Sequence, residues 1–372
     1  MTDSTQISDI ASARRLFGDP AGVLVETVLL RRRAAAKLDD VDDWLFTGEA
    51  LQQATAAPVA AHRAARLAGR TVHDVTCSIG TELAALRPVA EVLGSDRDPV
   101  RLAMARHNVA GVLLVRADAL RPVSRNTVVL ADPGRRVAGR RRFDPRDYEP
   151  PLDGLLDAYA DRDLVVKCSP GIDFEWLRQA GFTGEIEVTS SAGDVREACL
   201  WSPSLAAAQA QAQAQARAAV SRRATILQAA VPPEQITDAE PDDCPVAPAG
   251  RWIIDPDGAV VRAGLVRHYA ARHSLWQLDP RIAYLSGDHL PPGVRGFAVL
   301  DEMPFGEKRL RQALAARDCG AVEILVRGVD VDPAVLRPRL RLRGSQQLSV
   351  VITRIGAGAG ARAVAYICRP SR

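Results

Sequence analysis

The stretch Asp74-Val-Thr-Cys-Ser-Ile-Gly-Thr-Glu82 decides the fold of this chain. A short segment ending in Val72 and His73 leads into the acidic residue, and a turn of small side chains follows before a helical pattern begins at Glu82. Small residues at a strand-to-helix turn let the backbone approach a ligand closely. The stretch therefore predicts a nucleotide-binding turn in an α/β sheet.

A second acidic strand end lies at the spacing that such folds use. The segment Val92-Leu-Gly-Ser-Asp96 is typical of a strand, and its carboxylate follows the first acid by roughly 20 residues, where doubly wound folds place an acceptor for ribose hydroxyls. Asp98-Pro99 then supplies a helix N-cap and a proline at the first helical position, which predicts a helix ending at Asn108. Two further strand ends follow, at Asp118 and Asp132.

This order of motifs resembles the class I S-adenosylmethionine-dependent methyltransferases. The resemblance implies a Rossmann-like α/β sheet, S-adenosylmethionine as the cofactor and methyl transfer as the activity. It also implies that Asp96 binds the ribose and that Asp118 contacts the adenine amine. The first loop would hold the methionine part of the cofactor through Asp74, Cys77, Ser78 and Gly80, although only Gly80 remains of the family's three glycines.

The fourth motif, Asp132-Pro-Gly-Arg135, departs from the pattern of nucleic-acid amino-methyltransferases. Those enzymes carry an acid or Asn, two prolines and an aromatic residue, so that the acid and a backbone carbonyl accept hydrogen bonds from an exocyclic amine while the ring stacks on a flipped base. By this resemblance we expect Asp132 and the Pro133 carbonyl to orient an amine. Arg135 would stack through its guanidinium plane or bind a phosphate.

The chain as a whole resembles bacterial methyltransferases that carry a THUMP-like C-terminal domain. The resemblance rests on the Asp132-to-Arg136 strand end, the segment Lys167-Cys-Ser-Pro-Gly-Ile-Asp173 and the pattern Val322-Glu-Ile-Leu-Val-Arg-Gly328. True THUMP domains help to present RNA to modification enzymes, so the resemblance implies an RNA base as the methyl acceptor. A small-molecule methyltransferase and a non-catalytic RNA-binding protein on the same fold are the alternatives.

Composition and periodicity predict the domain organisation. We expect an N-terminal helical region at 1–68, a methyltransferase domain at 69–230, a linker at 231–250, a connecting region at 251–296 and a THUMP-like α+β domain at 297–372. Within the methyltransferase domain, 196–201 and 224–228 are expected to pair as antiparallel strands. Segment 206–216 consists of Ala and Gln without an apolar face, which predicts a surface arm.

Two arginine-rich segments are candidate phosphate-binding surfaces, with a solvated face as the alternative for each. The first contains Arg135, Arg136, Arg140, Arg141, Arg142 and Arg146 around a single acid, Asp144. In the second, Arg337, Arg339, Arg341 and Arg343 recur at every second position, so that a strand would place them on one face. We expect the substrate contacts to come from Arg135, Arg136, Lys167, Arg339 and Arg341. For Lys167, pairing with a carboxylate is the alternative.

The remaining composition is typical of a cytoplasmic enzyme without a metal centre. The 372 residues are 47% hydrophobic and 25% charged, and the net charge is only +3. No apolar run approaches the ~20 residues of a membrane span, and the N-terminal residues do not read as a secretion signal. The six cysteines lie far apart, which argues against a disulfide framework or a zinc site. The oligomeric state stays open.

Overall fold

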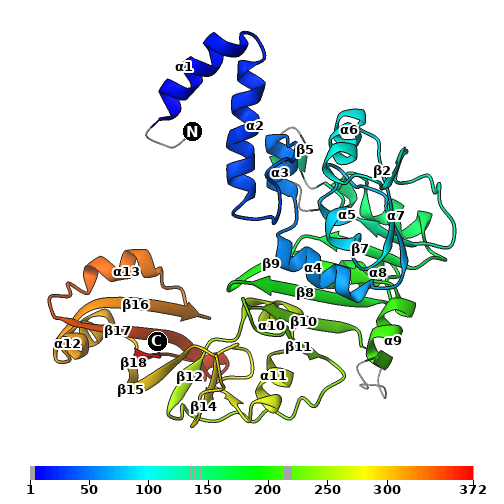
Figure 1. Cartoon of the computed structure of the whole chain (residues 1–372). Coiled ribbons are helices and arrows are strands. Elements are labelled where there is room, and N and C mark those ends of the chain that lie inside the picture. Colours follow the sequence, from blue (N-terminus) through cyan, green and yellow to red (C-terminus); the bar gives the residue numbers. More distant parts are fainter. Residues whose placement is uncertain (1–4, 135, 138–139, 142–143, 213–219, 372) are drawn as a thin grey trace. The chain divides into compact units, whose positions relative to one another are not determined.

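The computed structural model describes residues 5–134, 136–137, 140–141, 144–212 and 220–371. The chain forms two compact units (Figure 1). Unit 1 consists of Met1–Ser221 with Leu227–Pro233, and unit 2 of Arg222–Ile226 with Glu234–Arg372. Arg135 and Arg142, both named above as candidates for phosphate binding, lie outside the described residues.

Unit 1 begins with four helices, in the region predicted to be helical. They are α1 (Gln6–Phe17), α2 (Ala21–Ala34), α3 (Gly48–Gln53) and α4 (Ala57–Arg66). A segment of turns and bends around Asp39–Asp43 separates α2 from α3. Leu30 and Ala34 of α2 pack in one apolar cluster with Leu51 of α3 and with Ile79, which belongs to the loop after the first strand. This packing holds α3 against the predicted ligand-binding turn.

A mostly parallel sheet forms the centre of unit 1 and confirms the Rossmann-like prediction. Seven strands of this sheet lie wholly in unit 1: β1 (Thr71–Asp74), β2 (Glu91–Asp96), β3 (Leu113–Arg116), β4 (Val128–Ala131), β7 (Leu164–Cys168), β8 (Glu185–Ser191) and β9 (Asp194–Trp201). They follow the order β8-β9-β7-β4-β1-β2-β3. Because β1 pairs in parallel with both β2 and β4, the strand order reverses at β1. Ligands of such sheets bind beyond the carboxyl ends of the strands at this switch point.

The position of strand β9 differs from the predicted pairing of 196–201 with 224–228. It lies between β7 and β8 and runs antiparallel to both. The expected pair between 196–201 and 224–228 is therefore wrong. A two-residue turn at Ala192 and Gly193, both with positive φ, joins β8 directly to β9 as a tight hairpin. The later segment forms β10 (Arg222–Leu227), which pairs with β11 (Glu234–Thr237) inside the stretch predicted as a linker.

Short helices connect the strands of unit 1. They are α5 (Thr81–Leu86), α6 (Pro99–Asn108), α7 (Leu152–Ala158), α8 (Phe174–Gln179) and α9 (Pro203–Ala212), with two short strands, β5 (Arg136–Val137) and β6 (Arg140–Arg141), and the 3-10 turn η1 (Pro145–Asp147) between β4 and α7. Helix α6 begins and ends as predicted. Its start is fixed by the Asp98 side chain, which accepts hydrogen bonds from the amides of Val100 and Arg101. The predicted surface arm at 206–216 falls partly in α9, and residues 213–216 of the arm lie outside the described part.

Unit 2 contains a second, mixed sheet. Its strands are β12 (Trp252–Ile254), β13 (Trp276–Gln277), β14 (Leu285–Gly287), β15 (Gly296–Pro304), β16 (Cys319–Arg327), β17 (Gln346–Ile355) and β18 (Arg362–Pro370), in the order β13-β14-β12-β15-β18-β17-β16. Its helices are α10 (Gly258–Ala263), α11 (Val266–Arg272), α12 (Glu307–Ala315) and α13 (Pro333–Arg339), with the 3-10 turn η2 (Gly358–Gly360) before β18. Helices α10 and α11 are separated at Gly264, whose φ is 73°.

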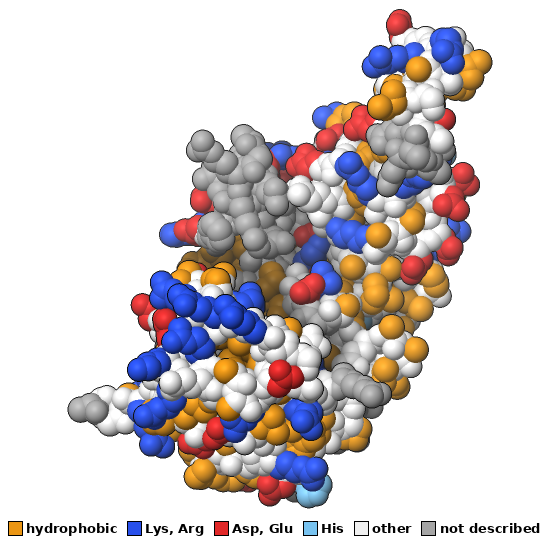
Figure 2. Space-filling view, turned by 90° about the vertical axis from the view of Figure 1, so that its left-hand side faces the viewer, with side chains coloured by type: hydrophobic (Ala, Val, Ile, Leu, Met, Phe, Trp, Pro, Cys, Tyr) orange, Lys and Arg blue, Asp and Glu red, His pale blue; other side chains and the backbone are white. Residues whose placement is uncertain are grey.

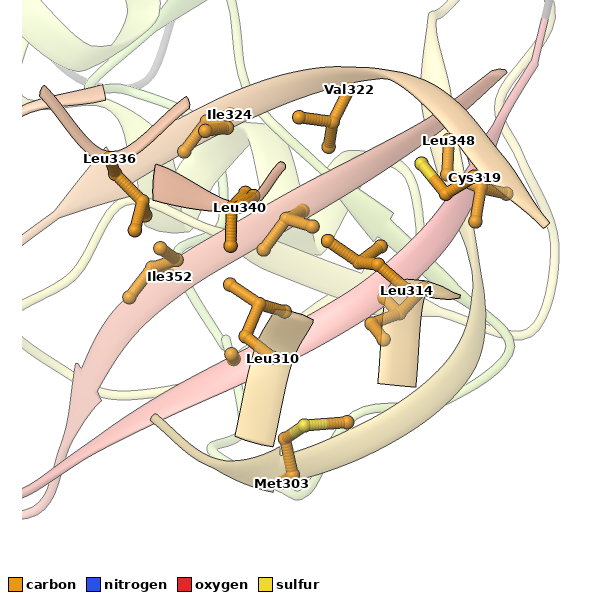
Figure 3. Packing of buried hydrophobic residues seen from close by; sticks show 13 residues of the cluster. Met303, Leu310, Leu314, Cys319, Val322, Ile324, Leu336, Leu340, Leu348 and Ile352 are labelled. Atoms are coloured by element: carbon orange, nitrogen blue, oxygen red, sulfur yellow. The ribbon is translucent and has the colours of Figure 1, made fainter. Parts of the chain in front are cut away.

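The conformation of 337–343 differs from the predicted strand. Arg337 and Arg339 belong to α13, and Arg341 and Arg343 follow it in a loop. Leu336 and Leu340, four residues apart, are both buried in the apolar cluster between α12, α13 and the sheet (Figure 3). Apolar burial at this spacing selects a helical turn, which overrides the alternating pattern of the arginines.

A buried histidine in β1 makes the stability of unit 1 depend on pH. The ring nitrogens of His73 lie 2.8 Å from Ser124 Oγ and 2.9 Å from Ser95 Oγ. Burial, with a smaller effect of Arg162, lowers the pKa of His73 to about 4. An unfolded chain binds this proton near pH ~6.5, whereas the folded chain binds it only near its lowered pKa. The stabilising effect of neutral His73 is therefore present above pH ~6.5 and is lost as the pH falls toward its folded pKa.

We expect this residue to contribute a slope of up to about 1.4 kcal/mol per pH unit to the free energy of unfolding over that interval. Urea unfolding of the wild type and of His73→Gln, measured from neutral pH down to pH ~4.5, checks it. The variant should lack this part of the slope. Equal pH dependence of the two proteins would assign the acid sensitivity to other groups.

Candidate active site

One cavity of unit 1 gathers six of the thirteen predicted site residues. It lies at the carboxyl ends of β1, β2, β3 and β4, and α3 forms another wall through Glu49 and Gln53. The predicted residues that line it are Asp74, Cys77, Ser78, Asp96, Asp118 and Asp132. Tertiary structure thus brings the expected cofactor residues and the expected catalytic carboxylate to one place.

The loop after β1 is shaped by its one remaining glycine. Gly80 has φ 92°, and a Cβ there would lie 2.8 Å from Val109 Cγ2. A side chain at this position would therefore be both strained and crowded. The turn places the Ser78 amide 3.0 Å from Asp96 Oδ2, to which it donates. Gly80 consequently supports the loop from beneath, while Cys77 and Ser78 reach the cavity.

Asp96 is held firmly at the end of β2. Its Oδ2 accepts from the Ser78 amide, and its Oδ1 accepts from the Asp98 amide at 2.8 Å. The side chain is buried, with 8% of its surface exposed. Each carboxylate oxygen can accept more than one hydrogen bond, so both still have capacity for donors in the cavity. A pair of neighbouring hydroxyls is a ligand group that suits this arrangement.

Asp118 has a different setting at the end of β3. It is exposed, and its Oδ1 accepts from the Leu120 amide at 2.9 Å. This hydrogen bond closes a local turn. The carboxylate nevertheless lines the same cavity as Asp96.

The cavity is strongly acidic. Asp74, at its base, is buried and accepts from the Thr76 amide at 3.1 Å. Burial, then the neighbouring Glu82, and to a smaller extent Asp132 and Asp96, raise the pKa of Asp74 well above its ordinary value. Eight acidic residues line the cavity and only two basic ones, Arg97 and Arg101. The acidic residues are Glu49, Asp74, Glu82, Asp96, Asp98, Asp118, Asp132 and Glu149. A cationic ligand would offset this repulsion.

Asp132 and Lys167 form an ion pair beside the cavity. Asp132 follows β4, where its amide donates to Thr76 Oγ1 at 2.7 Å, and its Oδ2 lies 2.5 Å from Lys167 Nζ. Lys167 is buried and also donates to Thr55 Oγ1 at 2.9 Å and to the Gln53 carbonyl at 3.4 Å. Burial opposes its charge, but Asp132, followed by Glu197 and Glu82, overcomes this effect and raises the pKa of Lys167. The carboxylate pairing considered from the sequence is thus present.

The other predicted substrate residues lie in varied settings. Pro133 is buried and does not line the cavity, whereas Gly134 does and exchanges both backbone hydrogen bonds with Glu149. The backbone of Arg136 belongs to β5. In unit 2, Arg339 pairs with Glu307 at 3.0 Å, and Arg341 is exposed.

Sequence reasoning missed a buried charge network beneath the cavity. Arg63 of α4 lies 2.6 Å from Glu82 and also pairs with Glu197 of β9. All three side chains are buried. Glu82 stands in the stretch that decides the fold, but no pattern links it to Arg63 or Glu197. Thr76, which contacts both Asp74 and Asp132, was missed for the same reason.

The comparisons with known proteins agree with this geometry. Two relatives from Mycobacterium tuberculosis, of strains CDC 1551 and H37Rv, are each 64% identical over 370 residues, which cover 96% of this chain and 100% of theirs. Both are named as uncharacterised S-adenosylmethionine-dependent methyltransferases. The chain belongs to the S-adenosylmethionine-dependent methyltransferases. Its residues 294–370 match the THUMP domain-like family.

A crystal structure also shares the fold of this methyltransferase. The protein comes from Porphyromonas gingivalis W83 and carries a provisional methyltransferase name. The two superpose with a TM-score of 0.73 over 100% of both chains, at 18% identity. The described part of our chain contains no helix with the length and hydrophobicity of a membrane span, and no group of three or more His, Cys, Asp or Glu side chains arranged to hold a metal ion.

The cavity of the methyltransferase suits its cofactor. S-adenosylmethionine supplies a methyl group already activated on a sulfonium, and it also carries an ammonium and two ribose hydroxyls. The buried carboxylate of Asp74 lacks a cationic partner among the described residues and lines the cavity, so it is suited to a positive group of the ligand. Asp96 would accept from the ribose hydroxyls, and Asp118 would contact the adenine. We propose these three contacts.

If Asp96 holds the ribose, Asp96→Ala should weaken binding of S-adenosylmethionine by about ten- to a hundredfold. The mutation would leave hydroxyl donors unpaired in a buried site and would also free the Ser78 amide. Titration calorimetry on the folded variant measures it, and Asp163→Ala, an acid outside the cavity lining, is the matched control. Wild-type affinity in Asp96→Ala would sink the assignment.

Proposed function

We propose that this methyltransferase modifies an RNA base, with an exocyclic amine as the favoured acceptor. The observation that carries the proposal is the THUMP domain-like match at 294–370 on the same chain as the methyltransferase unit. A domain that resembles those presenting RNA is not needed to bind a small metabolite in the active site. A small-molecule acceptor is therefore the alternative that the experiment below must exclude.

Asp132 supports an amine as the acceptor. Its carboxylate lines the cavity, its side chain is 31% exposed, and Lys167 occupies one oxygen, Oδ2. Among the described residues, no donor reaches the other oxygen. An anionic oxygen free to accept from an N–H can orient the amine and can take up the proton that the nitrogen loses after transfer. The Pro133 carbonyl has no place in this proposal, because Pro133 is buried and does not line the cavity. We propose that Arg135 or Arg136 binds the nucleotide.

The arginines of unit 2 support a polyanionic partner. Arg337, Arg339, Arg341 and Arg343 are all exposed. In Figure 2, which looks onto the side that carries α12 and α13, Lys and Arg side chains gather on one face. Arg341 and Arg343 have no carboxylate partner among the described residues, so they are free to bind phosphate oxygens. We infer that this face holds the RNA backbone.

Transfer of labelled methyl from S-adenosylmethionine to total RNA tests the proposed function directly. The RNA is taken from a strain that lacks the protein, so that its sites are unmodified, and DNA, protein and metabolite fractions of that strain are assayed in parallel. We expect label in RNA, and digestion to nucleosides should place it on an exocyclic amine. Label confined to the metabolite fraction would establish a small-molecule enzyme instead.

If the unit 2 arginines hold phosphates, RNA affinity should fall steeply with salt. The double variant Arg341→Ala and Arg343→Ala should bind more weakly and flatten the plot of log affinity against log salt by about 0.7–0.9 for each lost contact. The matched control replaces Arg267 and Arg272, which already pair with Asp242 and Glu240. An unchanged slope in the first variant would make its arginines a solvated face.

A further inference from the structure

The chain has few lysines, and two of them lie at the C-terminal end of α3. Only three of its 48 basic residues are lysines: Lys37, Lys167 and Lys308. Two of them bind the last carbonyls of α3, because Lys37 donates to Leu51 and Gln52, each at 3.0 Å, and Lys167 donates to Gln53. Cations favour the C-terminal end of a helix. Lysines thus hold the helix that forms one wall of the cavity.

Lys167 differs from Lys37 in one respect that matters for catalysis. Its ammonium has three protons and three acceptors: Asp132 Oδ2, Thr55 Oγ1 and the Gln53 carbonyl. The register explains the first contact, since Ala131 of β4 pairs with Val166 of β7, which places the next residue of each strand side by side. The ammonium has no proton left for a substrate, and the side chain does not line the cavity.

We propose that Lys167 is a positioning residue that joins the end of α3 to Asp132 and fixes the carboxylate toward the acceptor. The role differs from the substrate contact expected from the sequence. Its catalytic consequence rests on the proposed function of Asp132, whereas the link itself does not. A point charge with three separate donors suits three acceptors in different directions better than the planar fork of Arg, which agrees with a lysine in an arginine-rich chain.

The charges around the pair support this role. Lys167 faces Glu197 of β9, Glu82 of α5 and Arg63 of α4, and Lys37 lies near it. The charge of Asp132, together with those of Glu82 and Asp96, raises the pKa of Asp74. Without the ammonium, Asp132 would stand among carboxylates without its ion-pair partner. The pair therefore keeps an anionic acceptor in place where like charges would otherwise displace it.

The link is tested by the titration of Lys167, which needs neither RNA nor cofactor. Lysine labelled with carbon-13 gives one Cε signal for each of the three residues, assigned with Lys37→Arg and Lys308→Arg. At pH ~10.4, where an ordinary lysine is half protonated, Lys167 should remain mostly protonated. In Asp132→Asn its pKa should fall, because burial remains while the main opposing charge is gone. In Lys37→Met it should not fall. An unchanged titration in Asp132→Asn overturns the link.

The positioning role is tested by kinetics on the same variants. With RNA as acceptor, Lys167→Met should lower kcat by roughly ten- to a hundredfold and leave the Kd of S-adenosylmethionine within about twofold. Lys167→Arg keeps a positive charge and should retain more turnover, and Arg178→Met, which removes an exposed pair with Glu175, is the control. Full kcat in Lys167→Met overturns the role. If the wild type transfers no methyl to RNA, the proposed function fails, and the titration still decides the link.

Discussion

Replacing Asp132 by Asn is expected to lower turnover by about a hundredfold or more and to leave the affinity for S-adenosylmethionine unchanged. The expectation follows from its place: Asp132 lines the cavity but contacts Lys167 and Thr76, whereas the carboxylates proposed for the cofactor stand at β1, β2 and β3. Asn keeps the size of the side chain and loses its charge, so the change removes proton acceptance and not packing. Methyl transfer to RNA gives kcat, and calorimetry gives the Kd.

Asp118→Asn provides the contrast within the same cavity. Because Asp118 is expected to contact the adenine, its variant should raise the KM for S-adenosylmethionine and largely spare kcat. Opposite kinetic signatures in two carboxylates of one cavity would separate catalysis from cofactor binding. Full transfer activity in Asp132→Asn would remove this residue from the mechanism.

Replacing Arg63 by Met is expected to destabilise unit 1 by about 3–5 kcal/mol. Arg63 is 2% exposed and pairs with two buried carboxylates, Glu82 and Glu197. These neighbours raise the pKa of Arg63 well above its ordinary value even though burial opposes its charge. Removing the guanidinium would leave both carboxylates buried without their ion-pair partner. Urea unfolding followed by circular dichroism measures the change.

Two controls separate charge from volume in this experiment. Arg70→Met removes an exposed pair with Asp163 and should change the free energy of unfolding by less than about 1 kcal/mol. Adding Glu82→Gln and Glu197→Gln to Arg63→Met should recover part of the loss, because the remaining groups are neutral. A cost near that of Arg70→Met would mean that the network contributes little to the fold.

The ordered motifs show how much could be predicted without coordinates. The acidic strand ends at Asp74, Asp96 and Asp132, and the cap at Asp98, were all read from local patterns, and the structure brings the three acids into one cavity. Such patterns succeed because strand alternation, capping and small-residue turns act over a few residues. The membership of the chain in its enzyme family followed from the same motifs.

Where local patterns competed with packing, the prediction was wrong. The alternating arginines at 337–343 indicated a strand, but burial of Leu336 and Leu340 selects a helix that ends at Arg339. The pairing of β9 was also missed, because the choice of neighbour depends on the whole sheet and not on the two strands considered.

The sequence by itself determined the sheet type, the cofactor and the acids at the strand ends, since these depend on residues close together in the chain. Only tertiary structure decided which side chains meet. Lys167 contacts Thr55 across 112 residues, and Arg63 contacts Glu197 across 134. Sequence periodicity cannot reveal such pairs, because the two partners lie in distant segments of the chain. Each buried charge is costly unless its partner is present, so the pairs form only when the chain is folded. The chemistry of Asp132 depends on such a partner, so it became visible only in the folded chain.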